Sequence, residues 1–242
     1  MARFARIVIP GAWHHATQRG NAQQQVFFRD EDRGLYLALL RRYTGRYAVR
    51  ITGYCLMSNH VHIVAAPADS QGLARALGRT HNDYARWLNI QRRTTGHLWQ
   101  NRFYSCVLDE RHSWEALRYV ELNPVRADMV DDPANYRWTS YRANALGQTS
   151  TILTPHPLYQ SLGASNEERQ SAYRALFRPQ LDDEAISDIR LALNQSQPLG
   201  NERFYQQIEQ MTGQRRESKP RGRPRATPEG DNNMAGQGEL EL

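Results

Sequence analysis

The spacing of hydrophobic and polar positions changes several times along the chain, and each change predicts a new element. Alternating positions predict strands, because successive side chains of a strand point to opposite faces. Apolar residues three and four positions apart predict helices. The predicted strands cover residues 14–19, 49–56, 60–66 and 98–108. The predicted helices cover residues 30–47, 73–90 and 114–123, and Pro124 ends the last of them.

The order of these elements predicts the fold class. It runs β-α-β-β-α-β-α, without the regular alternation of a parallel sheet. Ser58 and Asn59 separate two strands and predict a turn, so residues 49–56 and 60–66 form an antiparallel hairpin. We therefore predict an α+β domain of the ferredoxin-like (split βαβ) or RRM-like class, an antiparallel sheet with helices on one face.

Composition divides the chain into three regions. Residues 1–148 contain the predicted sheet, and a stretch rich in Ser, Thr and Pro at residues 149–157 follows it. Residues 158–212 predict a small helical region. Its helices are expected at residues 166–177, 182–193 and 201–211. Residues 213–242 are polar and rich in Gly, Pro and charge, so we predict a disordered basic tail.

Charge is distributed unevenly along the 242 residues, whose formal net charge is +6. Residues 1–150 carry 20 Arg and 12 acidic residues, whereas residues 151–212 carry 5 Arg and 8 acidic residues. Residues 213–225 carry 6 basic residues and 1 acidic residue, and Lys219 is the only lysine. A genome rich in Arg codons would also raise the arginine count, but the clustering points to a polyanionic partner such as nucleic acid.

Neither a membrane span nor a secretory signal is expected. The sequence has no apolar run near the roughly 18 to 20 residues that a span requires, and residues 1–10 are too short and charged for a signal. Cys55 and Cys106 lie in apolar, strand-like surroundings without CxxC spacing, which predicts buried reduced thiols. We expect a cytoplasmic protein with no membrane partner.

His60 and His62 flank Val61 in a predicted strand. Alternate residues of a strand share a face, so the two imidazoles lie about 6 to 7 Å apart and can converge on one cation. Val61 then points to the opposite face, toward the core. Many strands carry two histidines without a metal, and zinc hydrolases and cupins combine such a pair with further His, Asp or Glu ligands. The pair alone therefore leaves these alternatives open.

Tyr119 and Asn123 are four residues apart in the predicted helix 114–123. This spacing places a phenol and an amide oxygen on one face, one turn apart. Each residue also has a structural explanation. Tyr119 is one of 12 tyrosines and can serve packing, and Asn123 can cap the helix before Pro124.

Four motifs occur in one order between residues 14 and 145. They are Thr17-Gln18-Arg19-Gly20-Asn21 followed by Val26-Phe27-Phe28, Asn59-His60-Val61-His62-Ile63-Val64, Gly96-His97-Leu98-Trp99-Gln100-Asn101-Arg102-Phe103, and Tyr119-Val120-Glu121-Leu122-Asn123-Pro124-Val125-Arg126-Ala127. With this set the chain resembles the REP-associated tyrosine transposases, relatives of the single-strand HUH transposases of small insertion sequences. Residues 150–180 and the basic tail also resemble the longer members of this group.

The resemblance implies a compact α+β core and assigns roles to four residues. His60 and His62 match the metal ligands, Tyr119 matches the nucleophile, and Asn123 matches a third ligand where related enzymes carry glutamine. Ser58 stands where proline is common, which affects only the turn. The implied cation is Mg²⁺ or Mn²⁺. Tyr119 would attack a DNA phosphodiester, form a 5′-phosphotyrosine and release a 3′-hydroxyl, and another 3′-hydroxyl can reverse this step without ATP.

The implied substrate is a single-stranded DNA hairpin, a REP-like palindrome. The candidate DNA contacts are Arg19, Asn21, Arg102 and Arg126 in the domain and Arg221, Arg223 and Arg225 in the tail. Further arginines on the predicted helices suit stem phosphates or are a solvated helix face; they are Arg41, Arg42, Arg46, Arg75, Arg79, Arg86, Arg92 and Arg93. The tail sequence Arg221-Gly222-Arg223-Pro224 resembles an AT-hook core, with a generic phosphate-binding tail as the alternative.

Two other functions compete with strand cutting. A catalytically silent regulator would bind nucleic-acid hairpins without cutting them. A metallohydrolase would use a metal-bound hydroxide and would tolerate Tyr119→Phe, but no carboxylate-rich ligand set accompanies the histidine pair. The DNA target, the general base for Tyr119, a nucleoid-associated location and the choice between monomer and homodimer stay open.

Overall fold

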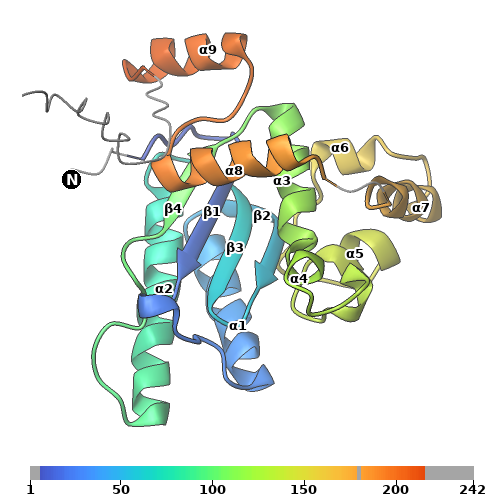
Figure 1. Ribbon diagram of the computed structural model, residues 1–242. Coiled ribbons are helices and arrows are strands. Elements are labelled where there is room, and N and C mark those ends of the chain that lie inside the picture. The colour runs from blue at the N-terminus through green and yellow to red at the C-terminus, as the bar shows by residue number, and fades with distance from the viewer. Residues whose placement is uncertain (1–5, 179–180, 216–242) are drawn as a thin grey trace, which may run out of the picture.

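The computed structural model describes residues 6–178 and 181–215 (Figure 1). Its four strands are β1 (His14–Arg19), β2 (Val49–Leu56), β3 (His60–Pro67) and β4 (Tyr104–Val107). They form one sheet in the order β2-β3-β1-β4, and every neighbouring pair is antiparallel. This is the strand order of the ferredoxin-like class, so the predicted α+β fold is confirmed. β1 and β3 lie at the centre of the sheet.

Helices connect the strands and follow them. The longer ones are α1 (Asp30–Arg46), α2 (Gly72–Arg92), α3 (Glu110–Glu121), α7 (Asn166–Leu176), α8 (Asp183–Gln195) and α9 (Glu202–Thr212). The short ones are α4 (Asn123–Arg126), α5 (Tyr141–Leu146), α6 (Pro157–Gln160) and the 3-10 turns η1 (Asn21–Gln23) and η2 (Pro133–Asn135). Within the described residues, no helix is both long and apolar enough to cross a membrane.

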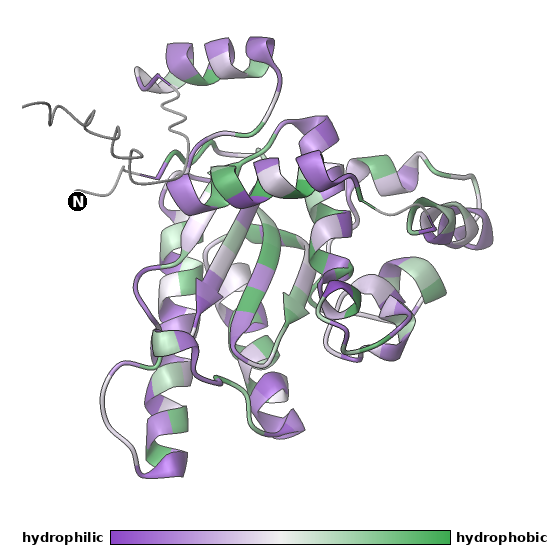
Figure 2. Cartoon of the chain, viewed as in Figure 1, coloured by the Kyte–Doolittle hydropathy of each residue, from purple (hydrophilic) through white to green (hydrophobic). Residues whose placement is uncertain are grey.

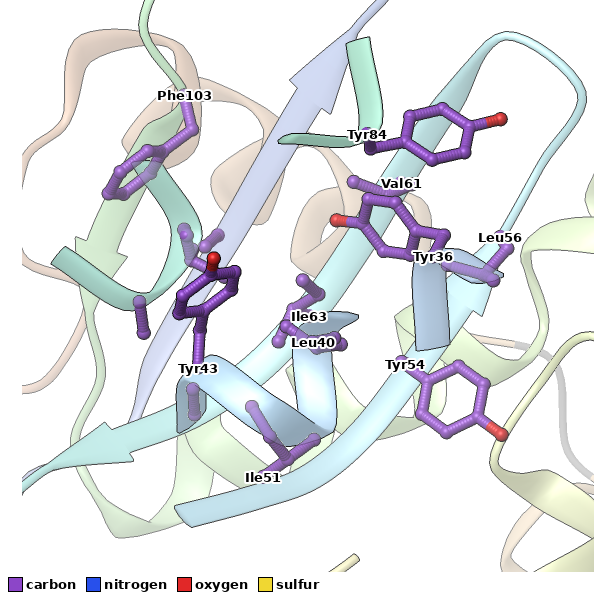
Figure 3. Packing of buried hydrophobic residues seen from close by; sticks show 14 of the residues in the cluster. Tyr36, Leu40, Tyr43, Ile51, Tyr54, Leu56, Val61, Ile63, Tyr84 and Phe103 are labelled. Atoms are coloured by element: carbon purple, nitrogen blue, oxygen red, sulfur yellow. The ribbon is translucent and has the colours of Figure 1, made fainter. Parts of the chain in front are cut away.

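One face of the sheet is covered by α1 and α2. Val61 and Ile63 of β3 point to this face, as the alternation predicts, and are almost fully buried. Figure 3 shows Tyr36 and Leu40 of α1 and Tyr84 of α2 packed over these strand residues. Burial of each such large apolar side chain contributes about 1.5–3 kcal/mol to folding. This layer fixes the position of β3, and with it the position of the two histidines.

The opposite face of the sheet is also covered, which differs from the prediction of helices on one face. α3 and α8 lie over this face, and Figure 1 shows α8 crossing the strands on the side opposite α1 and α2. Val120 of α3 and Ile189 of α8 are buried there against Val64 and Cys106. The physical reason is that hydrophobic residues occur along β2 and β3 (Figure 2) and alternate positions on both faces are buried, so each face needs a covering layer.

The C-terminal helices pack against the sheet domain. α8 joins the core layer with α3, and Ile208 of α9 is buried against Ile9 and Val107. α7 packs on α5, where Tyr173 meets Tyr141. The helices predicted at residues 166–177, 182–193 and 201–211 thus correspond to α7, α8 and α9, with ends within two residues of the prediction.

Two predicted elements have different bounds in the structure. The strand predicted at residues 98–108 is confined to Tyr104–Val107. The residues before Tyr104 do not join the sheet as a strand. Trp99, for example, lies against α2, where its indole N–H donates to the His81 carbonyl at 2.9 Å. The helix predicted at residues 114–123 begins at Glu110, because the Asp109 side chain accepts a hydrogen bond from the His112 backbone and caps the helix.

Candidate active site

The two central strands bring three histidines to one face of the sheet. In the β1–β3 register Thr17 lies opposite His62 and Arg19 lies opposite His60. Residues opposite each other on antiparallel strands share a face, and His15 shares it because it is two positions from Thr17. The rings of His60 and His62 lie 5.0 Å apart, centre to centre, at 88°. The shared face predicted for this pair is therefore present.

Each ring of the pair is held through its Nδ1 atom. His60 Nδ1 lies 2.6 Å from Asn59 Oδ1, and His62 Nδ1 lies 2.8 Å from His15 Nε2. Neither Nε2 atom has a hydrogen-bond partner among the described residues. A ligand histidine in proteins typically binds the cation with one ring nitrogen while the other is hydrogen-bonded. Both side chains are arranged in this way.

Burial keeps these histidines uncharged. It lowers the pKa of His60 to about 4, with Arg19 and Arg126 acting in the same direction. Burial lowers the pKa of His15 to about 3 and holds the pKa of His62 well below its usual value. At neutral pH each ring therefore keeps a lone pair, which a cation requires.

Tyr119 of α3 lies against this group. Its ring centre is 5.7 Å from the His62 ring at 85° and 5.7 Å from the His15 ring at 62°. Only 5% of the residue is exposed. α3 approaches the sheet closely at Gly53 of β2, where a Cβ atom would overlap the Leu117 side chain. A glycine at this position thus allows the helix to carry Tyr119 to the histidines.

Arg126 returns to Tyr119 because the chain turns after α3. Its guanidinium lies 4.0 Å from the centre of the Tyr119 ring, and its Nη1 donates to the Tyr119 carbonyl oxygen at 2.8 Å. Its buried Nε has no hydrogen-bond partner among the described residues. Arg126, a predicted DNA contact, lies directly at the predicted nucleophile.

Asn123 begins α4 rather than continuing α3, which ends at Glu121. Pro124 therefore does not end the helix that carries Tyr119; it occupies the first turn of α4, where its missing N–H costs nothing. Asn123 is buried, with 8% of its surface exposed. Its backbone carbonyl accepts a hydrogen bond from Ala127. α3 and α4 meet at Leu122, whose backbone stays in the right-handed helical region, so Tyr119 and Asn123 lie on two consecutive helical segments.

The donor set fits a divalent cation that accepts nitrogen and oxygen ligands. No cluster of three or more His, Cys, Asp or Glu residues suited to a metal occurs within the described part of the chain. His15 does not extend the pair, because its Nε2 contacts His62. Two neutral imidazoles with unpaired Nε2 atoms remain, and an amide oxygen such as that of Asn123 would have to complete the set.

The other predicted DNA contacts lie at different distances from the pair. Arg19 ends β1 opposite His60, and the Asn21 backbone follows directly, bonded to the Leu98 carbonyl. Arg102 lines a groove of about 1100 Å³ between α2 and residues 94–102. Arg86 and Arg93 also line this groove, and no acidic residue does. The tail residues Arg221, Arg223 and Arg225 lie outside the described residues.

Two buried groups lie outside the residues predicted from the sequence. His15 is beside His62 because of the strand pairing, and its spacing of two from Thr17 and four from Arg19 is the sequence signal that places it on the histidine face. Glu121 is fully buried and accepts hydrogen bonds from Ser140, Asn144 and Tyr173. Burial raises its pKa to about 7, although these hydrogen bonds lower it.

The chain is similar to one known protein family. Residues 11–123 match the family model described as IS200-like transposase. The matched stretch contains all four strands, the histidine pair and Tyr119. The resemblance seen in the sequence motifs is confirmed by this match.

One of two similar solved structures shows the same fold. A REP-associated tyrosine transposase bound to a REP hairpin matches with a TM-score of 0.53 and 13% sequence identity, over 64% of this chain and 93% of that chain. A proposed transposase from Deinococcus radiodurans R1 gives a TM-score of 0.35 and 18% identity, over 50% of this chain and 96% of that chain. The comparison with curated proteins gives no match.

Proposed function

We propose that this chain is a metal-dependent endonuclease and strand transferase of single-stranded DNA, with Tyr119 as its nucleophile. The observation that carries the proposal is the contact between Tyr119 and His62, whose ring centres lie 5.7 Å apart at a face where two histidines keep unpaired Nε2 atoms. The match of residues 11–123 to the IS200-like transposase family supports it.

His60 Nε2, His62 Nε2 and the Asn123 amide oxygen are the proposed ligands of one divalent cation. Mg²⁺ prefers oxygen ligands, so a set with two imidazoles suits Mn²⁺ at least as well. When bound, such a cation neutralises charge on the non-bridging phosphate oxygens of the substrate.

Tyr119 attacks the phosphorus in line. The phenolic oxygen forms a new P–O bond, the bond from phosphorus to the 3′ oxygen breaks, and that oxygen leaves as a 3′-hydroxyl after taking up a proton. The strand on the 3′ side of the cut stays joined to Tyr119 through its 5′ phosphate, which conserves the phosphodiester energy for rejoining. A free tyrosine has a pKa near 10, so the phenol must lose its proton as it attacks. Arg126 places a positive charge beside the ring, near the negative charge that develops during the attack.

The proposed substrate is a DNA hairpin with a single-stranded flank, of the REP-like palindromic kind. The structural relative with the same fold is bound to a REP hairpin. In this chain Arg19 and Asn21 lie at the edge of the site, and the groove with Arg86, Arg93 and Arg102 offers positive charge to phosphates. The tail arginines would add salt-sensitive affinity. The location we propose is the cytoplasm, at the nucleoid, and either a monomer or a homodimer is compatible.

A cleavage assay tests this proposal. Single-stranded hairpins from the flanks of the gene, 5′-labelled, are incubated with the full chain and Mn²⁺ or EDTA and separated on a denaturing DNA gel. We expect a shortened labelled product with Mn²⁺, none with EDTA, and none with Tyr119→Phe. Tyr47→Phe, at the end of α1, is the matched control and should cut like wild type. Binding without any cut would favour a silent hairpin-binding regulator, and cutting by Tyr119→Phe would favour a metal-activated water.

A further inference from the structure

His15 lies behind the proposed metal ligands and has no part in the proposed function. It is fully buried on β1, and its Nε2 lies 2.8 Å from His62 Nδ1. Its other ring nitrogen, Nδ1, is buried and has no hydrogen-bond partner among the described residues. A buried polar atom without a partner is uncommon and calls for a physical explanation.

The two facing nitrogens share one hydrogen, so one ring donates and the other accepts. If His62 Nδ1 donates, His62 Nε2 keeps its lone pair and can bind a cation. If His15 Nε2 donates, a neutral His62 carries its hydrogen on Nε2 and cannot bind. The direction of a single hydrogen bond therefore decides whether His62 is a ligand.

His60 does not face this choice. Its Nδ1 lies 2.6 Å from Asn59 Oδ1, and a carbonyl oxygen only accepts. His60 therefore donates from Nδ1 and keeps the lone pair on Nε2. His62 differs because its partner is a histidine, which can act in either direction.

The unpaired Nδ1 of His15 shows which direction of the His15–His62 hydrogen bond is favoured without a cation and which is favoured with one. When His62 donates, neutral His15 must carry its hydrogen on Nδ1, where the described residues offer no acceptor. When His15 donates from Nε2, its Nδ1 is a bare lone pair, which is less costly to leave unpaired than an N–H group. The second arrangement is thus favoured without a cation, and a cation on His62 Nε2 selects the first.

We propose that His15 is a positioning residue for a divalent-cation site: it accepts the hydrogen bond from His62 Nδ1 and thereby holds His62 in the tautomer that binds the cation. Binding of the cation and reversal of the His15–His62 hydrogen bond are then one event. This inference rests on the proposed function, which makes His62 a ligand. Its test therefore measures metal binding without DNA.

The test is titration of the full chain with Mn²⁺, followed by the electron paramagnetic resonance signal of free Mn²⁺. His15→Leu removes the acceptor and should weaken Mn²⁺ binding about 10- to 100-fold. His15→Gln places a carbonyl oxygen at a similar reach and should bind close to wild type. His81→Leu is the matched control. It removes another buried histidine whose Nε2 is hydrogen-bonded, here to Tyr36 at 2.9 Å, but on the α2 side of the sheet. It should lower stability and leave the affinity unchanged.

Imidazole nitrogen NMR of the wild-type chain supplies a second measurement that does not depend on folding of a variant. His62 should carry its hydrogen on Nε2 without metal and on Nδ1 with saturating Mg²⁺, a diamagnetic cation. A His62 ring that keeps its hydrogen on Nε2 under saturating Mg²⁺ would overturn the proposal.

The other outcomes separate this inference from the proposed function. Unchanged Mn²⁺ affinity in a folded His15→Leu variant, or equal losses in His15→Leu and His15→Gln, would overturn the role of His15 alone. Absence of Mn²⁺ binding in the wild type would overturn both the metal-dependent function and this inference. A His15-dependent Mn²⁺ site in a chain that cuts no DNA would overturn the enzyme and leave the role of His15 standing.

Discussion

The guanidinium of Arg126 lies 4.0 Å from the centre of the Tyr119 ring and is fixed there by a 2.8 Å hydrogen bond from its Nη1 to the Tyr119 carbonyl oxygen. The chain turn between α3 and α4 creates this contact, since Arg126 lies seven residues after Tyr119 and returns to it. A fixed cation thus accompanies the proposed nucleophile even before DNA is bound.

Arg126→Gln should slow strand cutting because it removes the positive charge that lies beside the proposed nucleophile. We expect about a tenfold loss of rate, which corresponds to about 1.4 kcal/mol of transition-state stabilisation. Single-turnover cleavage rates measure this, and Arg126→Lys should restore part of the rate because it keeps the charge. A rate for Arg126→Lys as low as that of Arg126→Gln would contradict the electrostatic role.

The groove between α2 and residues 94–102 should bind hairpin phosphates. Replacing both Arg86 and Arg93 with Gln should weaken binding and reduce the slope of log affinity against log salt by about 1.5, the effect of two phosphate contacts. Arg41→Gln with Arg42→Gln removes the same charge from exposed positions on α1 and serves as the control. Fluorescence anisotropy at several salt concentrations compares the two. Equal slopes in both double variants would exclude the groove as the specific contact.

Glu121 should make the folded chain less stable as pH rises. Burial raises the pKa of this carboxyl to about 7 from an ordinary value near 4.5, so the folded state binds the proton more tightly than the unfolded state. Its contribution to stability is fully present below pH 4.5 and is lost as pH rises through 7, a change on the order of 3 kcal/mol. Glu121→Gln should remove this dependence.

Urea unfolding of wild type and Glu121→Gln at pH 5 and pH 8 measures the difference. The free energy of unfolding of wild type, measured relative to that of Glu121→Gln, should decrease from pH 5 to pH 8. The comparison between proteins is needed because the buried histidines change stability in the opposite direction. If the difference in free energy of unfolding between wild type and Glu121→Gln is the same at both pH values, Glu121 is ionised in the folded state throughout this range.

The buried histidines should make the chain unstable in acid. Burial lowers the pKa of His14 to about 4, of His81 to about 3 and of His156 to about 4, besides the site histidines. Groups with a lowered folded pKa contribute stability above their unfolded value of 6.5, and this contribution is lost as pH falls through the folded value. Each of these histidines should lower the free energy of unfolding by about 2 kcal/mol when the pH falls to 5. Urea unfolding of Glu121→Gln at pH 7 and pH 5 tests this, and equal stabilities would contradict it.

The sequence was sufficient where local spacing decides the structure. Alternation placed His60 and His62 on one face and Val61 and Ile63 on the other, because the strand period acts within a few residues. The bounds of β1 and β2 agree with the prediction for the same reason.

It was insufficient where contacts between distant segments decide. The His15–His62 hydrogen bond depends on the pairing register of β1 with β3, 47 residues apart, which no local pattern contains. The cover of α3 and α8 on the second face depends on Val64 and Cys106 being buried by helices that follow much later in the chain. The separation of Asn123 from α3 was missed because Pro124 is equally compatible with ending one helix and beginning the next.

The covalent step is the central claim, and a denaturing protein gel tests it most directly. A 3′-labelled single-stranded hairpin is incubated with the full chain and Mn²⁺, and wild type is compared with Tyr119→Phe. We predict label that migrates with the wild-type protein, that is absent from Tyr119→Phe and that disappears with EDTA. A chain that cuts the hairpin with no label on the protein, or a Tyr119→Phe variant that still becomes labelled, would contradict a Tyr119 5′-phosphotyrosine intermediate.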